Sequence, residues 1–288
     1  MYLLGTSLYN LEKFSEAIEA FKNVIKAYSQ DTELVQKAEY EIADCFYQMG
    51  NEKEAMERFK SLRAKYPDSS LTPEVMWWLG EYHYRHNELA VARRYFSSLV
   101  QDFPQSSLIA DAYYALGSIS QEEGKFEEAK QDFKKVMTLS KSDFAGTAAI
   151  AIADMQVRQG LTNQALEMYK EILTNYAHLA YLVYPKMADI YQEIGRHEEA
   201  LDLYHKTMAI APSRQAATIQ FKIGEIKEAQ GKKKEAIEEY LKVTYLYPQD
   251  NSLTVKALLR IASLYEAQED FMQAQAAYEK IAVMNVEE

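Results

Sequence analysis

A short motif recurs eight times along the chain: alanine followed four residues later by phenylalanine or tyrosine. The copies are spaced at intervals of 35 to 38 residues, and their alanines are Ala17, Ala55, Ala92, Ala129, Ala165, Ala200, Ala236 and Ala274. A constant period of this length indicates a structural unit that buries its apolar face only against copies of itself. The chain is therefore predicted to be a linear array of repeats that fills nearly all of its 288 residues.

Other positions follow the same register, in which the alanine of the motif is numbered position 20. At position 8 every repeat has a small residue: Gly5, Ala43, Gly80, Gly117, Ala153, Ala188, Gly224 and Ala262. A small residue allows two helices to approach closely, because no long side chain holds the backbones apart. Position 15 is glycine in five repeats, such as Gly50, which suits the left-handed end of a first helix. Each repeat is thus expected to be a pair of amphipathic helices.

An aliphatic residue or methionine precedes the small residue, as Leu79 precedes Gly80, and proline stands at position 32 of several repeats, as at Pro67 and Pro104. This pattern of Leu-Gly, aromatic, Ala, Phe and Pro resembles the tetratricopeptide repeat. The resemblance covers about 95% of the chain and implies an all-α fold. We expect about sixteen helices, forming a right-handed superhelix whose concave groove is lined by the first helix of each repeat.

The repeats are longer than the usual ~34 residues, and several are joined by an aromatic residue, proline and a polar pair, as at 66–69, 103–106 and 247–250. Long repeats with this join look like those of bacterial cell-envelope proteins. The two types in question are the outer-membrane barrel-assembly lipoprotein and the periplasmic Tol-Pal coordination protein. This narrower resemblance implies a periplasmic or envelope-associated protein, with a cytoplasmic location as the alternative.

Composition excludes several other classes. Lys and Arg number 32 against 43 Asp and Glu, a net charge of −11 that would repel nucleic acid. No apolar run approaches the ~20 residues of a membrane span, and no signal sequence opens the chain. The single cysteine, Cys45, excludes an intrachain disulfide framework and a thiolate zinc cluster.

No catalytic or cofactor motif is present, and we predict that the protein is not an enzyme and has no cofactor. There is no phosphate-binding glycine loop, nucleophile elbow or zinc-protease motif. His83 and His86 stand three residues apart and could share a metal, but His83 occupies a packing position and is expected to be a core residue. Cys45 is expected to be a small buried residue, and Lys232–Lys234 a solvated turn.

The register breaks between residues 176 and 186. Pro185 would fall inside the first helix of a regular repeat, where it would cost about 3 kcal/mol. A helix that begins near Pro185 is the expected solution, with a boundary between two sub-arrays in this segment as the functional alternative to a merely shortened helix. Both ends look cut within a repeat, so the chain is expected to be a fragment of a longer protein.

The resemblance assigns the groove to first-helix positions 2, 5, 9, 12 and 13. In the N-terminal half, position 5 of all four repeats and position 12 of the first three are aromatic. We name this set the aromatic strip: Tyr2, Tyr9, Tyr40, Tyr47, Trp77, Tyr84 and Tyr114. Asp44 and Glu81 lie between these rings, with Arg85 at one edge. We predict that these ten residues bind a partner, because exposed aromatic side chains in a groove are typical binding hot spots. The alternative is that the rings only pack between neighbouring helices.

The family's carboxylate clamp needs lysine at position 5 and asparagine at position 9, and neither is found here. The expected ligand is a protein or peptide that is apolar with some basic character. The leading hypothesis is a non-enzymatic scaffold that binds a partner within a bacterial envelope assembly. A truncated regulatory or targeting module of a larger enzyme or secretion machine is the alternative, and a catalytic protein would require a convergent polar pocket.

Overall fold

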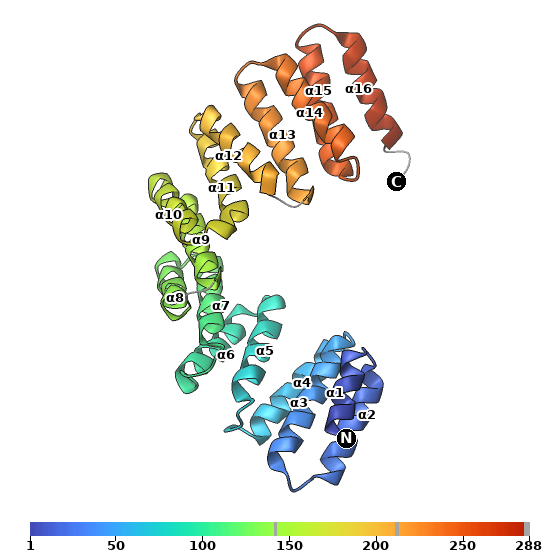
Figure 1. Ribbon diagram of the computed structural model, residues 1–288, viewed down its shortest axis with the longest axis vertical. Helices are drawn as coiled ribbons and strands as arrows, with labels where there is room; N and C mark the ends of the chain where they lie inside the picture. Colours follow the sequence, from blue (N-terminus) through green and yellow to red (C-terminus); the bar gives the residue numbers. More distant parts are fainter. Residues whose placement is uncertain (141–142, 211–212, 285–288) are drawn as a thin grey trace. The chain divides into compact units, whose positions relative to one another are not determined.

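The computed structural model describes residues 1–140, 143–210 and 213–284, and this part of the chain consists of α-helices joined by short turns (Figure 1). The chain divides into two compact units, an N-terminal unit, Met1–Ala148, and a C-terminal unit, Ala149–Glu288. The N-terminal unit contains four helix pairs: α1 (Tyr2–Asn10) and α2 (Phe14–Ala27), α3 (Thr32–Gln48) and α4 (Glu52–Lys65), α5 (Thr72–Arg85) and α6 (Leu89–Asp102), and α7 (Ile109–Glu122) and α8 (Phe126–Leu139).

The division between the units falls within α9. The remaining pairs are α9 (Asp143–Arg158) and α10 (Thr162–Asn175), α11 (Ala180–Glu193) and α12 (His197–Ile210), α13 (Ser213–Ala229) and α14 (Lys233–Leu246), and α15 (Asn251–Glu266) and α16 (Phe271–Met284). With sixteen helices and no strand among the described residues, the predicted all-α repeat solenoid is confirmed. None of these helices combines the length and the apolar character that a bilayer crossing requires.

The turn inside each repeat depends on one residue with a positive φ. Gly50, for example, has a φ of 76° and ends the first helix, and its amide donates to the carbonyl of Tyr47. Three repeats place a non-glycine residue at this point and keep the same conformation: Glu12, Asn87 and Glu269, with φ of 59° to 60°. The repeat register thus fixes the turn even where the favoured glycine is absent.

The core of each of the first seven repeats contains a buried aromatic ring of the second helix, and where position 8 is glycine the ring lies against that glycine of the first helix. A Cβ atom added to Gly80 would stand 2.6 Å from Cε1 of Phe96, and one added to Gly117 would stand 2.9 Å from Cε1 of Phe133. Both rings are almost completely buried. The predicted close approach of the two helices at position 8 is therefore present.

The prediction that a helix begins near Pro185 is wrong. A 3-10 turn, Ala177–Leu179, follows α10, and α11 begins at Ala180, so that Pro185 lies inside α11. Ala180 and Val183 of its first turn are buried. Their burial outweighs the hydrogen bond that the proline nitrogen cannot make. A sub-array boundary within 176–186 stays a prediction.

Candidate functional site: the first-helix faces of the two units

The rings of the aromatic strip at position 5 pack on the core phenylalanine of their own repeat. The ring centroids are 5.4 Å apart for Tyr2 and Phe21, and 5.2 Å apart for Trp77 and Phe96. Tyr40 and Tyr114 make the same contact with Phe59 and Phe133. All four strip residues are half-buried. One face of each ring therefore belongs to the core, and only the remainder is available to a ligand.

Hydroxyl groups of the strip join neighbouring first helices. Tyr2 donates to Glu41 at 3.0 Å and Tyr9 to Asp44 at 2.5 Å, which ties α1 to α3. Tyr84 of α5 donates to Glu122 of α7 in the same way. Burial, with the adjacent carboxylate, raises the pKa of these hydroxyls above the ordinary tyrosine value. These tyrosines are therefore neutral donors that help to hold consecutive repeats together.

Two carboxylates on this face are poorly solvated. Burial raises the pKa of Glu41 and of Glu81 above the ordinary value, which shows that the charged form of each is disfavoured. Arg85 opposes this effect at Glu81. Within the described residues, neither glutamate has an ion pair to a lysine or arginine shorter than 4.0 Å. A cation brought by a ligand would relieve this cost.

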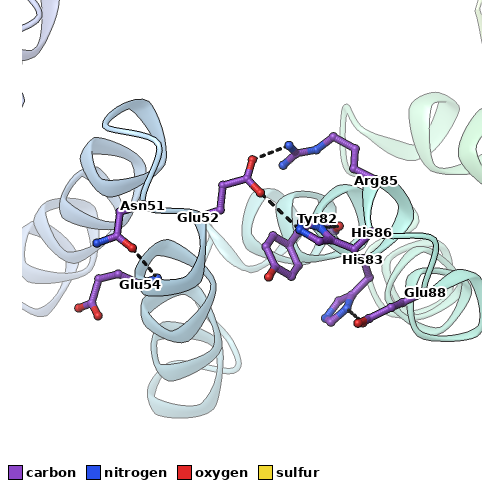
Figure 2. A network of polar contacts seen from close by, with 8 residues as sticks. All are labelled: Asn51, Glu52, Glu54, Tyr82, His83, Arg85, His86 and Glu88. Carbon is purple, nitrogen blue, oxygen red and sulfur yellow. Dashed lines mark hydrogen bonds and ion pairs between the residues drawn. The ribbon is translucent and has the colours of Figure 1, made fainter.

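Arg85, the strip's one predicted cation, is already engaged (Figure 2). Its guanidinium donates to Glu52 of α4 at 2.6 Å, and it lies 5.4 Å from the centre of the Tyr47 ring. His86 lies 3.7 Å from the other oxygen of Glu52 and stacks on Tyr82. The end of α5 is thus bound to the start of α4, and Arg85 contributes to the contact between these two repeats.

His83 behaves as the expected core residue. Its side chain is buried, its Nδ1 faces Glu88 at 2.5 Å, and its ring stacks on Tyr95 (Figure 2). No cluster of three or more potential metal ligands lies in the described part of the chain. Cys45 is also buried, and burial raises the pKa of its thiol to about 12, so it is not a reactive thiolate.

A different arrangement on the C-terminal unit was missed by the sequence reasoning. Here the core ring of the second helix is tyrosine, and its hydroxyl reaches a polar residue of the first helix. Tyr169 donates to Asp154, and Tyr204 donates to Asp189 and to Gln192. The signal was present in the repeat register, because position 24 changes from phenylalanine to tyrosine after the fourth repeat.

Position 6 of the C-terminal unit is also distinctive, and we name its three cations the cation ladder: Lys186, Lys222 and Arg260. Lys186 Nζ lies 2.8 Å from Asp154, and Lys222 Nζ lies 2.5 Å from Asp189. Each lysine thus contacts the acidic residue of the preceding first helix. The N-terminal unit has Leu3, Glu41, Trp78 and Ala115 at this position.

One hollow of the N-terminal unit lies away from these residues. It has a volume of about 480 Å³ and lies between α4, α5 and α6, with Lys60, Arg63, Tyr95 and Asp102 among its lining residues. Arg63 lies 5.4 Å from the centre of the Tyr95 ring. No residue of the predicted partner-binding set lines this hollow.

Comparison with known families agrees with this architecture. Models described as tetratricopeptide repeat match residues 2–70, 74–106, 110–143, 179–249 and 256–283. Together they cover most of the chain, which belongs to the tetratricopeptide repeat family. The fold therefore defines a protein–protein interaction scaffold. The search of curated proteins finds no match.

Solved structures share the fold at low sequence identity. A tetratricopeptide repeat protein from Parabacteroides merdae has a TM-score of 0.60 at 16% identity, covering 89% of this chain and 96% of that chain. The C-terminal part of a repeat protein from Cytophaga hutchinsonii has 0.57 at 16%, covering 99% and 95%. Aspartyl phosphate phosphatase F from Bacillus subtilis has 0.58 at 14%, covering 91% and 74%. These likenesses show the fold alone.

Proposed function

We propose that the chain is a non-enzymatic scaffold that binds a partner segment in the groove formed by the first helices of its N-terminal unit. The segment is apolar with some basic character. The observation that carries this proposal is the combination of half-buried rings with Glu41 and Glu81, whose charged forms are disfavoured by burial. Apolar side chains of the segment cover the exposed parts of the rings, and a lysine or arginine neutralises the carboxylates.

The proposed roles of the residues in this groove differ from one residue to the next. Trp77 has no hydroxyl to engage and packs on Phe96, so its exposed part is the central apolar contact. Tyr9 and Tyr84 hold neighbouring helices through their hydroxyls, and their rings form the walls of the groove. Arg85 keeps Glu52 in place at the edge. Binding at the strip and packing within the fold therefore use different parts of the same side chains.

The test is a fluorescence-anisotropy titration with labelled peptides about 12 residues long that carry two lysines and two leucines. Glu81→Gln should weaken binding and reduce its dependence on salt, since one attractive charge is lost. Glu225→Gln is the matched control, because Glu225 occupies position 9 of the seventh repeat and burial also raises its pKa. Equal effects of the two substitutions, or equal binding of peptides with glutamate in place of lysine, would contradict the proposal.

We also place the scaffold in a bacterial envelope assembly, which is supported by the long repeats and by the aromatic-proline joins. Fractionation of the native organism tests this placement: the protein should be found with the periplasm or the envelope. Recovery with the cytoplasm, or a gene that continues into an enzyme domain, would favour the alternative of a regulatory or targeting module.

A further inference from the structure

The hollow between α4, α5 and α6 combines buried apolar side chains with charged ones. Met76 and Leu79 of α5 line it and are completely buried, and the half-buried ring of Phe103 lines it as well. Its volume of about 480 Å³ is within the range of ligand sites, so it can accept a side chain as large as phenylalanine. Because no residue of the aromatic strip lines this hollow, it is separate from the groove of the first helices.

Position 4 distinguishes this repeat from the one before it. In the second repeat, Glu39 at position 4 forms an ion pair with Lys65 at position 30, with 2.7 Å between Oε1 and Nζ. The third repeat has Met76 and Asp102 at these two positions, and a methionine cannot form such a pair. The bridge between the first and second helix is therefore missing here, and Asp102 lines the hollow without an ion-pair partner among the described residues.

The arginine of the hollow is available to a ligand carboxylate. Arg63 lies 5.4 Å from the centre of the Tyr95 ring and has no ion pair with a carboxylate in the described part of the chain. A guanidinium has five N–H donors, and stacking on a ring uses none of them. Lys60, which also lines the hollow, contacts only Glu57, at 3.7 Å. This part of the hollow therefore attracts negative charge.

The acidic part of the hollow lies further along α6. Asp102 follows Tyr95 by seven residues, and a helix rises about 1.5 Å per residue, so the two lie about 10 Å apart along the axis. Asp68 and Asp102 also line a neighbouring hollow of about 470 Å³, together with Glu74. One carboxylate oxygen of Glu74 is buried and has no hydrogen-bond partner among the residues described. An acceptor left in this state is costly, so an ammonium group is favoured there.

We infer that the second helices α4 and α6 form a second binding surface, which takes an extended segment of mixed charge from a protein partner. An aromatic side chain of the segment enters the hollow over Met76 and Leu79. An acidic residue of the segment binds Arg63, and a lysine reaches Asp68 and Asp102. Because an extended chain advances about 3.3 Å per residue, the two charges of the segment stand about three residues apart. A segment with only one sign of charge would leave one part of the hollow unpaired.

This surface does not depend on the aromatic strip. Trp77 and Met76 are neighbours in α5, but Trp77 packs on Phe96 and does not line the hollow, whereas Met76 does. The segment proposed for the strip is apolar and basic, whereas the hollow requires an acidic residue as well. Each surface can therefore fail alone, and a change to one should leave the other intact.

The test is an anisotropy titration of the full chain with a labelled peptide that has a glutamate and a lysine about three residues apart and a phenylalanine between them. This peptide should bind about fivefold more tightly than versions with two glutamates or two lysines. Arg63→Gln should weaken binding about fivefold, and it should have no effect on a peptide with glutamine in place of the glutamate. Arg94→Gln is the control, because Arg94 is an exposed arginine of α6 that does not line the hollow. Trp77→Ala should leave this binding unchanged, which separates the inference from the function proposed for the strip.

Ala64→Phe tests the hollow itself without disturbing the core. Ala64 is an exposed residue of α4 that lines the hollow, so a ring added there should fill it while the melting temperature stays the same. Binding of the mixed-charge peptide should fall about tenfold. Gln101→Phe, at the same position of the third repeat, is the control, because Gln101 does not line the hollow. Absence of binding to the wild-type chain, equal binding of the two-lysine peptide, or a folded Ala64→Phe variant with wild-type affinity would each overturn the inference.

Discussion

Replacement of Gly80 by alanine tests the packing on which every repeat depends. The new Cβ atom would lie 2.6 Å from Cε1, 2.7 Å from Cζ and 2.9 Å from Cδ1 of Phe96. Carbon atoms in good contact are about 3.5–4.0 Å apart, so the edge of the ring must withdraw by about 1 Å. Phe96 is fully buried and has little space in which to move.

Two effects of opposite sign set the magnitude of this change. Overpacking a core costs about 1–3 kcal/mol, whereas alanine in place of glycine in a helix gains about 1 kcal/mol. A net loss of about 1 kcal/mol is therefore expected for Gly80→Ala. Gly117→Ala should be almost neutral, because its Cβ would stand 2.9 Å or more from Phe133. Ala43 at the same position of the second repeat shows that the repeat can be built around alanine.

Urea unfolding of the two variants, followed by circular dichroism, measures the difference. Phe96→Leu, alone and combined with Gly80→Ala, supplies the control, since a smaller side chain should remove most of the clash and the two changes should couple by about 1 kcal/mol. If Gly80→Ala instead raises stability by the full helix-propensity gain and shows no coupling, the close approach does not constrain this core.

Three further predictions concern stability. Tyr204→Phe removes a buried hydroxyl that donates to Asp189 and should lower the free energy of unfolding by about 1–3 kcal/mol, whereas Tyr278→Phe, at an exposed ring, should cost less than about 0.5 kcal/mol; similar losses in thermal unfolding would contradict this. Burial raises the pKa of Asp132 to about 6 from 3.8, so its ionisation in the folded state destabilises the protein as the pH rises from about 4 to 6. Asp132→Asn should therefore raise stability by about 1 kcal/mol near neutral pH, after allowance for partial solvent exposure, and the gain should vanish near pH ~4; a constant gain at both pH values would refute the assignment. Hydrogen exchange should be faster within 176–186 than in α5 to α8, since Pro185 interrupts the hydrogen bonds of α11, and uniform protection would remove the case for a boundary there.

Register explains why so much of the fold followed from the sequence. Position 8 and position 24 face each other in the four repeats that have glycine at position 8, so the small residue and the ring together identify the helix pair from the sequence. Pro185 shows the limit of this reasoning: a local rule placed a helix start there, but burial of Ala180 and Val183 one turn earlier decided the boundary. The position at which α11 begins can be read only from the packing of the turn before Pro185.

The candidate site was harder to predict from the sequence, because each strip side chain packs one part of its ring in the core and exposes another part. The strip's tyrosines were recognised from their spacing, but the acceptors Glu41, Asp44 and Glu122 depend on the neighbouring helix. Lys222 and Asp189 stand 33 residues apart, and only the stacking of repeats brings them to 2.5 Å. Pairs of this kind could be sought by comparing positions 6 and 9 of consecutive repeats.

Tryptophan emission offers the most direct test of binding at the aromatic strip. The chain has two tryptophans, Trp77 and Trp78, both on α5, and Trp78→Phe leaves Trp77 as the single reporter at the centre of the strip. Titration of this variant with the lysine–leucine peptide should change the emission of Trp77, and the change should saturate with the affinity measured by anisotropy. Saturable binding of that peptide with no change in Trp77 emission would place the partner site away from the strip and contradict the proposed function.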